Sequence, residues 1–341
     1  MPNFNSSNLV KAQALINQDF QNPEMRQQPA PVLALGQRNN EIITPSHSVL
    51  RTREDRPIET YIMTRNMRST AGATRTHNHT GSLGDSMSMP LAWTSFTDKF
   101  QFSLKWLDNN IFPTDRVLAN QFAQAFQNIR NDIEEFLINY LESEKTQVNI
   151  ATKNGNWNAT NDTFEIITRE NRGLFFEDSK SMMRQNFYSG LLDAVLDPKL
   201  FRDAAWWANQ GSSNAYNTSF QFGGINFVES IGLSNDDYTE GTGLILPANT
   251  FGVLDWIPRQ NREGNGDFNT YVGGFGSMID PVSGLTMAIH GYSQRADTSA
   301  SNGNAQDVVI EFEVSVDISP NLAPLSNANE TVVYEVAQLI A

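Results

Sequence analysis

Residues 114–148 read TDRVLANQFAQAFQNIRNDIEEFLINYLESEKTQV, the longest helical pattern in this chain. Apolar residues recur at steps of three and four, which places them on one face of a helix. They are Leu118, Phe122, Phe126, Ile129, Ile133, Phe136, Leu137, Tyr140 and Leu141. At about 1.5 Å per residue, the pattern predicts a rod roughly 50 Å long, far longer than an average helix. Ile138 falls almost opposite this stripe, which indicates a second contact surface.

A second long element lies near the carboxyl end. From Val308 to Ile318 the even positions are apolar, whereas Glu311, Glu313 and Asp317 occupy odd positions. This alternation predicts a strand of about 36 Å with one buried and one acidic face. Residues 331–340 predict a further strand. One long helix followed by long strands indicates an α+β fold.

The segment before the long helix has a different character. Residues 8–21 predict a short helix, but nothing up to about residue 55 has the apolar density of a core segment. Residues 57–63 alternate as a strand, and the return limb is expected at residues 96–106. About twenty-five residues rich in Ser, Thr and Gly separate these limbs. A connection this long is typically functional or disordered.

The middle of the chain mixes helices and strands. Apolar spacing predicts a helix over residues 178–196. Asp197 and Pro198 then suit the cap and first position of another helix, expected to end near Asn209. The pair Gly223-Gly224 introduces a strand over residues 225–230.

Composition limits the possible functions. The chain has 341 residues, of which only 18% are charged, and a net charge of −14. A chain this acidic should repel nucleic acid. The charge is uneven, because residues 1–80 carry +3 and the remainder −17. Either this difference is a chance fluctuation of composition, or the first quarter lies against acidic surface of the same or a neighbouring subunit.

Several classes of protein are excluded or disfavoured. With no Cys, there can be neither disulfides nor thiolate metal sites. The amino terminus lacks a signal-peptide pattern, and no apolar run approaches the ~18 residues of a membrane span. We therefore expect a protein that is synthesised in the cytoplasm and has no membrane contact.

No catalytic constellation emerges from the sequence. His77 and His79 lie in a Gly/Ser/Thr-rich loop with no Cys and only Asp85 nearby, which disfavours a metal site. The run 273–276 is not a phosphate-binding loop, because no Lys-Ser/Thr follows it, and it fits a bulge or sharp turn. The pair Trp206-Trp207 could stack a sugar or a base, but a core role fits at least one ring better. We expect no catalytic residues, cofactor or metal.

The order of these elements resembles the major capsid protein of tailed bacteriophages, the Hong Kong-type capsid fold. The run Leu196-Asp197-Pro198-Lys199-Leu200, followed by a helix, is similar to a common capsid pattern. So is the glycine-introduced strand in Phe222-Gly223-Gly224-Ile225-Asn226-Phe227-Val228-Glu229-Ser230. Residues 306–318 resemble the long strand of the family's peripheral domain.

The resemblance implies a division of the chain. Residues 1–55 correspond to an N-terminal arm and residues 56–106 to the extended loop, a β-hairpin. Residues 107–165 and 306–341 correspond to the peripheral domain, which contains the spine helix 114–148 and the peripheral sheet. Residues 166–305 correspond to the axial domain.

The implied function is structural and not enzymatic. Copies of the chain would assemble into hexamers and pentamers of an icosahedral head shell in the virion, enclosing the phage genome. Expected partners are other copies, separate scaffolding, portal and decoration proteins, and double-stranded DNA non-specifically. Some relatives join subunits through a loop Lys, but no Lys occurs between Lys11 and Lys99, which predicts a non-covalent shell.

Three alternatives remain open: a nanocompartment shell of the same fold, a carbohydrate-acting or carbohydrate-binding protein that uses acidic and Trp residues, and a tail or baseplate protein. As candidate subunit-interface residues we select Phe100, Phe102 and Trp106 on the loop limb and Ile138 on the spine. Alanine at these positions is expected to impair assembly more than folding.

Overall fold

The computed structural model describes most of the chain in separate ranges. These are residues 6–21, 30–38, 47–63, 86–103, 113–146, 156–167, 174–185, 188, 190–209, 219–233, 241–268, 270–297, 306–323 and 332–339. Within them the fold is α+β, as expected. In the described part of the chain, helices that are both long and apolar enough to cross a bilayer are absent.

The spine helix α5 runs over Thr114–Ser143. Its predicted apolar stripe is confirmed, because most of these side chains belong to one large buried cluster. The helix ends five residues earlier than predicted. The stripe stops at Leu141, and the Thr146 N–H instead donates to the Val333 carbonyl at 2.8 Å. The described segment after Ser143 therefore turns away toward the last strand.

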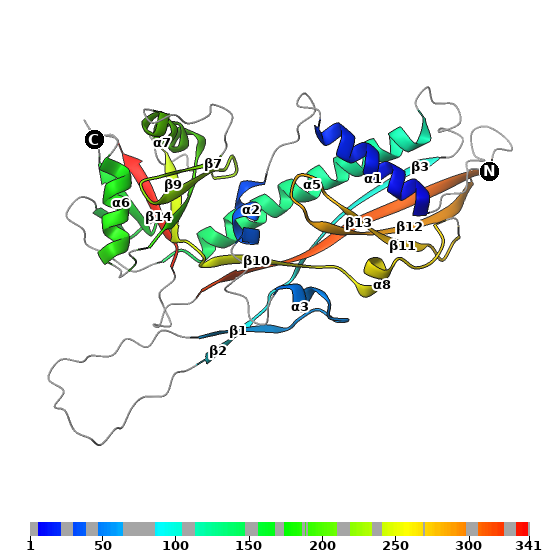
Figure 1. Cartoon of the computed structure of the whole chain (residues 1–341), viewed down its shortest axis with the longest axis horizontal. Helices are drawn as coiled ribbons and strands as arrows, with labels where there is room; N and C mark the ends of the chain where they lie inside the picture. The colour runs from blue at the N-terminus through cyan, green and yellow to red at the C-terminus, as the bar shows by residue number, and fades with distance from the viewer. Residues whose placement is uncertain are drawn as a thin grey trace, which may run out of the picture.

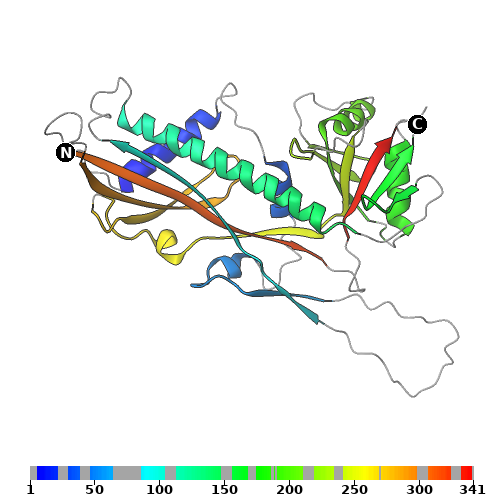
Figure 2. The ribbon, with the colours of Figure 1, turned by 180° about the vertical axis from the view of Figure 1, so that it is seen from behind.

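A five-stranded sheet lies along the spine helix (Figure 2). Its strands are β3 (Thr94–Ser103), β10 (Phe251–Trp256), β11 (Gly274–Ile279), β12 (Thr286–Asp297) and β13 (Gln306–Leu322). The order is β10-β13-β12-β11, and β3 also pairs with β13. The Phe122 ring on α5 lies 5.0 Å from Phe100 on β3 and 5.3 Å from Phe312 on β13. Helix and sheet thus share one aromatic core.

A seven-stranded sheet forms the other end of the molecule (Figure 1). In sheet order its strands are β4 (Asn156–Asn158), β5 (Thr163–Ile167), β14 (Tyr334–Leu339), β9 (Thr242–Pro247), β6 (Leu192–Leu196), β8 (Ile225–Glu229) and β7 (Ser219–Phe222). Helices α6 (Leu174–Gln185) and α7 (Pro198–Asn209) contribute to its separate apolar core.

The sheets divide the chain at other places than the predicted boundaries 166 and 306. Strands β10, β11 and β12 precede residue 306 but pair with the long strand β13. Strand β14 follows residue 306 but pairs with β5 and β9. The sequence predicts individual elements along the chain, but it does not predict which strands from distant segments pair with one another.

The amino-terminal segment contributes to the core, which corrects the expectation that it lacks core residues. Helix α1 (Ser6–Gln21) packs on α5, and α2 (Pro31–Arg38) packs on α5 and β10. Their buried residues belong to the same cluster as the spine: Leu9, Ala12, Ile16, Val32, Leu33 and Leu35. The helix predicted over residues 8–21 is confirmed as α1, whereas α2 has only 8 residues, too few for a helical period to stand out in the sequence.

Residues 178–196 do not form one helix. Helix α6 ends at Gln185, and residues 192–196 form the fully buried strand β6. A fully buried strand has no polar alternation, so periodicity alone does not distinguish its apolar residues from a helical stripe. The next element is as predicted, because the Asp197 carboxylate accepts the Leu200 N–H at 2.7 Å and caps α7.

Candidate functional site: an anchored hairpin

A two-stranded hairpin stands apart from both sheets (Figure 1). Strand β1 (Glu59–Met63) pairs antiparallel with β2 (Ser86–Pro90). The predicted first limb is therefore confirmed, but its partner is not residues 96–106. That segment, where described, forms β3 in the five-stranded sheet. Alternating apolar residues identified β3 as a strand without identifying the strand beside it.

One face of the hairpin is polar. Ser88 Oγ donates to Glu59 Oε2 at 2.6 Å, and the Tyr61 hydroxyl donates to Glu59 Oε1. The hydrogen bond from Ser88, and to a lesser extent that from Tyr61, lowers the pKa of Glu59. The hydrogen bond to Glu59 raises the pKa of Tyr61. The carboxylate is thus held ionised and the phenol protonated.

The other face is apolar. In the pairing register Thr60 lies opposite Met89 and Ile62 opposite Met87. Met87 is 40% exposed, and Ile58, just before β1, is 81% exposed. An isolated two-stranded hairpin is at best marginally stable in water. Thr60 on this face is only 2% exposed, so the face is covered at its base, whereas Met87 and Ile58 keep apolar area exposed among the described residues.

Ion pairs anchor the base of the hairpin to the body. Arg51, at the end of helix α3 (His47–Arg51), donates through Nε to the buried Asp255 on β10 at 2.9 Å. Arg56 Nε lies 2.9 Å from Asp317 on β13, and Ser95 also donates to this carboxylate. Both carboxylates are largely buried and belong to the five-stranded sheet. The direction of the hairpin is thus set within its own subunit.

Side chains that donate hydrogen bonds to main-chain carbonyls add to this anchor. The Arg53 carbonyl accepts from Trp256 Nε1 at 3.3 Å and from Arg262 Nη2 at 2.6 Å. Arg262 belongs to the short helix α8 (Arg259–Glu263). Trp93 Nε1 donates to the Pro57 carbonyl at 2.7 Å. The segment that leads into the hairpin is therefore fixed at several points.

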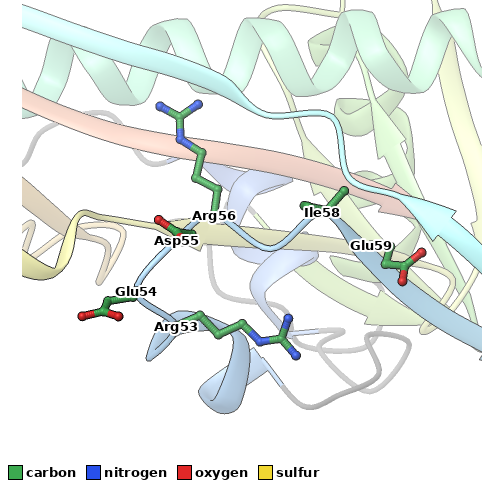
Figure 3. Close-up of a pocket in the computed structure, with 6 residues that line it drawn as sticks. All are labelled: Arg53, Glu54, Asp55, Arg56, Ile58 and Glu59. Atoms are coloured by element: carbon green, nitrogen blue, oxygen red, sulfur yellow. The ribbon is translucent and has the colours of Figure 1, made fainter.

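A shallow hollow of about 440 Å³ lies at this base. Six residues line it: Arg53, Glu54, Asp55, Arg56, Ile58 and Glu59. Figure 3 shows these side chains pointing in different directions rather than toward a common point. Within the described ranges, the His, Asp and Glu side chains form no group of three that could hold a metal ion. The hollow's geometry fits an anchor better than a reaction site.

The predicted interface residues that the structure describes lie outside the hairpin. Phe100 packs against Phe122 and Phe312 beneath the spine helix. Phe102 is opposite Ile310 in the β3–β13 register, and its side chain lies outside the described residues, as does all of Trp106. Ile138 is 2% exposed and packs next to Gly232. Whether any of them touches a neighbouring subunit stays a prediction.

Sequence reasoning missed the residues that position the hairpin. The available signal was the close spacing of Arg51, Arg53 and Arg56 in the mildly basic first quarter, although Glu54 and Asp55 lie between them. Two of them meet Asp255 and Asp317 of the acidic remainder. In one of the two interpretations of the uneven charge, the first quarter lies against acidic surface of the same or a neighbouring subunit. For Arg51 and Arg56 that acidic surface belongs to the same subunit.

Comparison with known proteins gives matches among solved structures. The capsid of cyanophage A-1(L) matches with a TM-score of 0.51 at 10% identity, over 94% of this chain and 99% of that one. The chain has the phage-capsid fold. The capsid of cyanophage P-SCSP1u aligns with a TM-score of 0.45 at 12% identity, over 85% of this chain and 86% of that one.

The SrpI encapsulin of Synechococcus elongatus PCC 7942 aligns with a TM-score of 0.43 at 11% identity. That alignment covers 87% of this chain and 88% of the encapsulin chain. No protein-family model and no curated protein matches the sequence. The phage-capsid fold is therefore recognised through structure.

Proposed function

We propose that this chain is the structural subunit of a phage head shell, assembling into the hexamers and pentamers that enclose the genome. The observation that carries the proposal is the anchored hairpin. Its base is fixed by buried carboxylates, while its apolar face and Ile58 have exposed area that another copy can cover. A second copy at that face would bury the exposed side chains of Met87 and Ile58 and so stabilise the part of the hairpin that its own subunit leaves uncovered.

In this proposal the spine helix and five-stranded sheet act as the peripheral domain and the seven-stranded sheet as the axial domain. The chain performs no catalysis and needs no cofactor. It is synthesised in the host cytoplasm and resides in the virion. Its partners are other copies, scaffolding, portal and decoration proteins, and packaged DNA through non-specific contacts. The shell is held together without covalent links between subunits.

The net charge of −14 is compatible with a container for DNA. Phosphates are repelled by carboxylates, so packaged DNA should slide along an acidic lining without adhering. The low charged fraction also suits contacts between subunits, because fewer ions lose water when such contacts form.

Substitution of Ile58 tests this proposal. We expect Ile58→Asp to reduce shell formation at least tenfold, because it places a charge in the proposed contact. The exposed side chain should contribute little to folding, so the subunit's unfolding free energy should change by no more than about 0.5 kcal/mol. Negative-stain electron microscopy would count shells, and chemical denaturation would measure stability.

Two variants serve as controls. Ile58→Val keeps an apolar side chain and should assemble normally, and Val49→Asp adds the same charge at a 49% exposed position outside the hairpin. Normal shells from Ile58→Asp would contradict the proposed contact. Nuclease-resistant DNA in the shells indicates a phage head, whereas enclosed protein cargo indicates a nanocompartment. Compact monomers at all concentrations would favour the carbohydrate-binding alternative.

A further inference from the structure

Strand β11 forms one edge of the five-stranded sheet. The main-chain N–H and C=O of Phe275 point away from β12, because they form hydrogen bonds with a residue outside the sheet. The Phe275 N–H donates to the Asn265 carbonyl at 2.6 Å, and the Asn265 N–H donates back at 3.1 Å. Main-chain groups of an antiparallel strand alternate in direction, so Ser277 and Ile279 also face outward.

Gln13 of helix α1 covers the outward groups of Ile279. Its Nε2 donates to the Ile279 carbonyl at 2.9 Å, and the Ile279 N–H donates to Gln13 Oε1 at 2.9 Å. A primary amide offers the same donor and acceptor as a peptide unit. The Gln13 side chain therefore takes the place that a residue of a further strand would occupy.

Ser277 lies between these two covered positions. It is exposed, and across the described ranges its outward N–H donates no hydrogen bond and its outward carbonyl accepts none. Beside it a groove of about 900 Å³ extends between α1, α8 and β11. Val10 on α1 is 69% exposed and Ile279 is 54% exposed, so apolar area flanks the Gln13 contact.

The sequence of β11, Gly-Phe-Gly-Ser-Met-Ile over residues 274–279, contains no charged residue and no proline. Natural sheets usually protect an edge strand with such residues, because an open edge pairs readily with another strand. The same edge of another molecule is a matching partner, because its Ser277 and Ile279 present the same uncharged outward donors and acceptors. Two such edges can pair antiparallel around a two-fold axis near Met278, which sets Ser277 of each copy opposite Ile279 of the other.

We propose that the outer edge of β11 is a latent strand-pairing surface for a second copy of this chain, and that Gln13 keeps it closed. The surface is distinct from the hairpin contact and does not depend on it. Pairing at β11 would join two subunits in an orientation that differs from that of the hairpin contact. Together with that contact it would produce irregular polymers. Gln13 thus limits association to the other surfaces of the subunit.

Substitution of Gln13 by leucine tests the proposal. Gln13→Leu removes both hydrogen bonds and keeps a side chain of similar length. The matched control is Gln18→Leu, the same change at an exposed position of the same helix. Sedimentation velocity should show self-association of the dissociated Gln13→Leu subunit at least tenfold stronger than that of Gln18→Leu. Equal association of the two variants would overturn the proposal.

A second substitution shows whether β11 is the surface that pairs. Ser277→Pro removes an outward N–H, which an edge strand tolerates; Ser277→Lys places a charge on the edge and serves the same purpose if the proline variant does not fold. Either change, combined with Gln13→Leu, should restore the association of the control. Persistent association would point to the new leucine itself and would refute the strand-pairing surface. Because dissociated subunits are compared, the outcome is independent of shell formation.

Discussion

Arg130 and Asp280 form an ion pair inside the protein. Their side chains are 0% and 1% exposed, and Arg130 Nη1 lies 2.8 Å from Asp280 Oδ2. The same carboxylate accepts the N–H groups of Val282 and Ser283 in the turn between β11 and β12. A single buried carboxylate thus connects the spine helix with the end of the sheet.

Replacing Arg130 by methionine should lower the unfolding free energy by about 3–5 kcal/mol, because it leaves the Asp280 charge buried without its partner. Urea denaturation of the subunit would measure this. The control is Arg116→Met, which removes an exposed ion pair with Asp19 and should cost less than about 1 kcal/mol. Equal effects of the two variants would contradict the structural role of the buried pair.

Glu134 on the spine helix caps helix α2. Its two carboxylate oxygens accept the N–H groups of Val32 at 3.0 Å and Leu33 at 3.1 Å. These donors lie in the first turn of α2, where a helix has no internal acceptors. Burial, partly offset by these bonds and by one from Ser230, raises the pKa of Glu134 to about 7.

The stability of the subunit should therefore depend on pH near neutrality. A carboxyl whose folded pKa lies above its unfolded value contributes stability below the unfolded value and loses it as the pH rises through the folded one. Between pH 6 and pH 8 we expect the unfolding free energy to fall by about 1 kcal/mol. Glu134→Gln should abolish this change, whereas Glu135→Gln, at an exposed position, should retain it. An unchanged pH profile in Glu134→Gln would contradict the assignment.

At the level of elements, the pattern of residues predicted helices and strands better than it predicted their partners. The alternation from Val308 to Ile318 identified β13, and the stripe from Leu118 to Leu141 identified α5. The alternation at residues 96–102 identified a strand, yet its partner is β13 and not β1. Pairing is determined by which faces meet in space, and a single sequence does not record that.

Phe100 illustrates the consequence for the candidate site. Because its ring packs 5.0 Å from Phe122 and 5.6 Å from Phe312, Phe100→Ala should lower the unfolding free energy by about 2–3 kcal/mol. Guanidinium denaturation would measure the loss. Unchanged stability together with lost assembly would instead establish Phe100 as an interface residue. The anchoring residues could not be placed from the sequence, since Arg51 and Asp255 are 204 positions apart.

On the scale of the whole molecule, the two largest apolar cores of the described residues are joined at the end of the spine helix. Just beyond α5, the Lys145 ammonium donates to the Asn161 carbonyl at 2.6 Å and pairs with Glu335 of β14. Thr242 of β9 also donates to Glu335, at 3.2 Å. The spine helix is thus fixed to the middle strands of the seven-stranded sheet.

Lys145→Met should weaken this junction. Glu335 is 5% exposed, so removing its cation should cost about 2 kcal/mol of unfolding free energy. Hydrogen exchange should show faster exchange of the β14 amides, while those of the five-stranded sheet change little. Lys180→Met, which removes a pair with the exposed Glu177, is the control. Equal exchange of β14 in the two variants would show that Lys145 does not hold the junction.

The central claim is that copies of this chain build a closed shell. Negative-stain electron microscopy of the purified wild-type protein tests it most directly. We predict closed particles, or free hexamers and pentamers, that persist on dilution without covalent links between subunits. Compact monomers at every concentration examined would contradict the account.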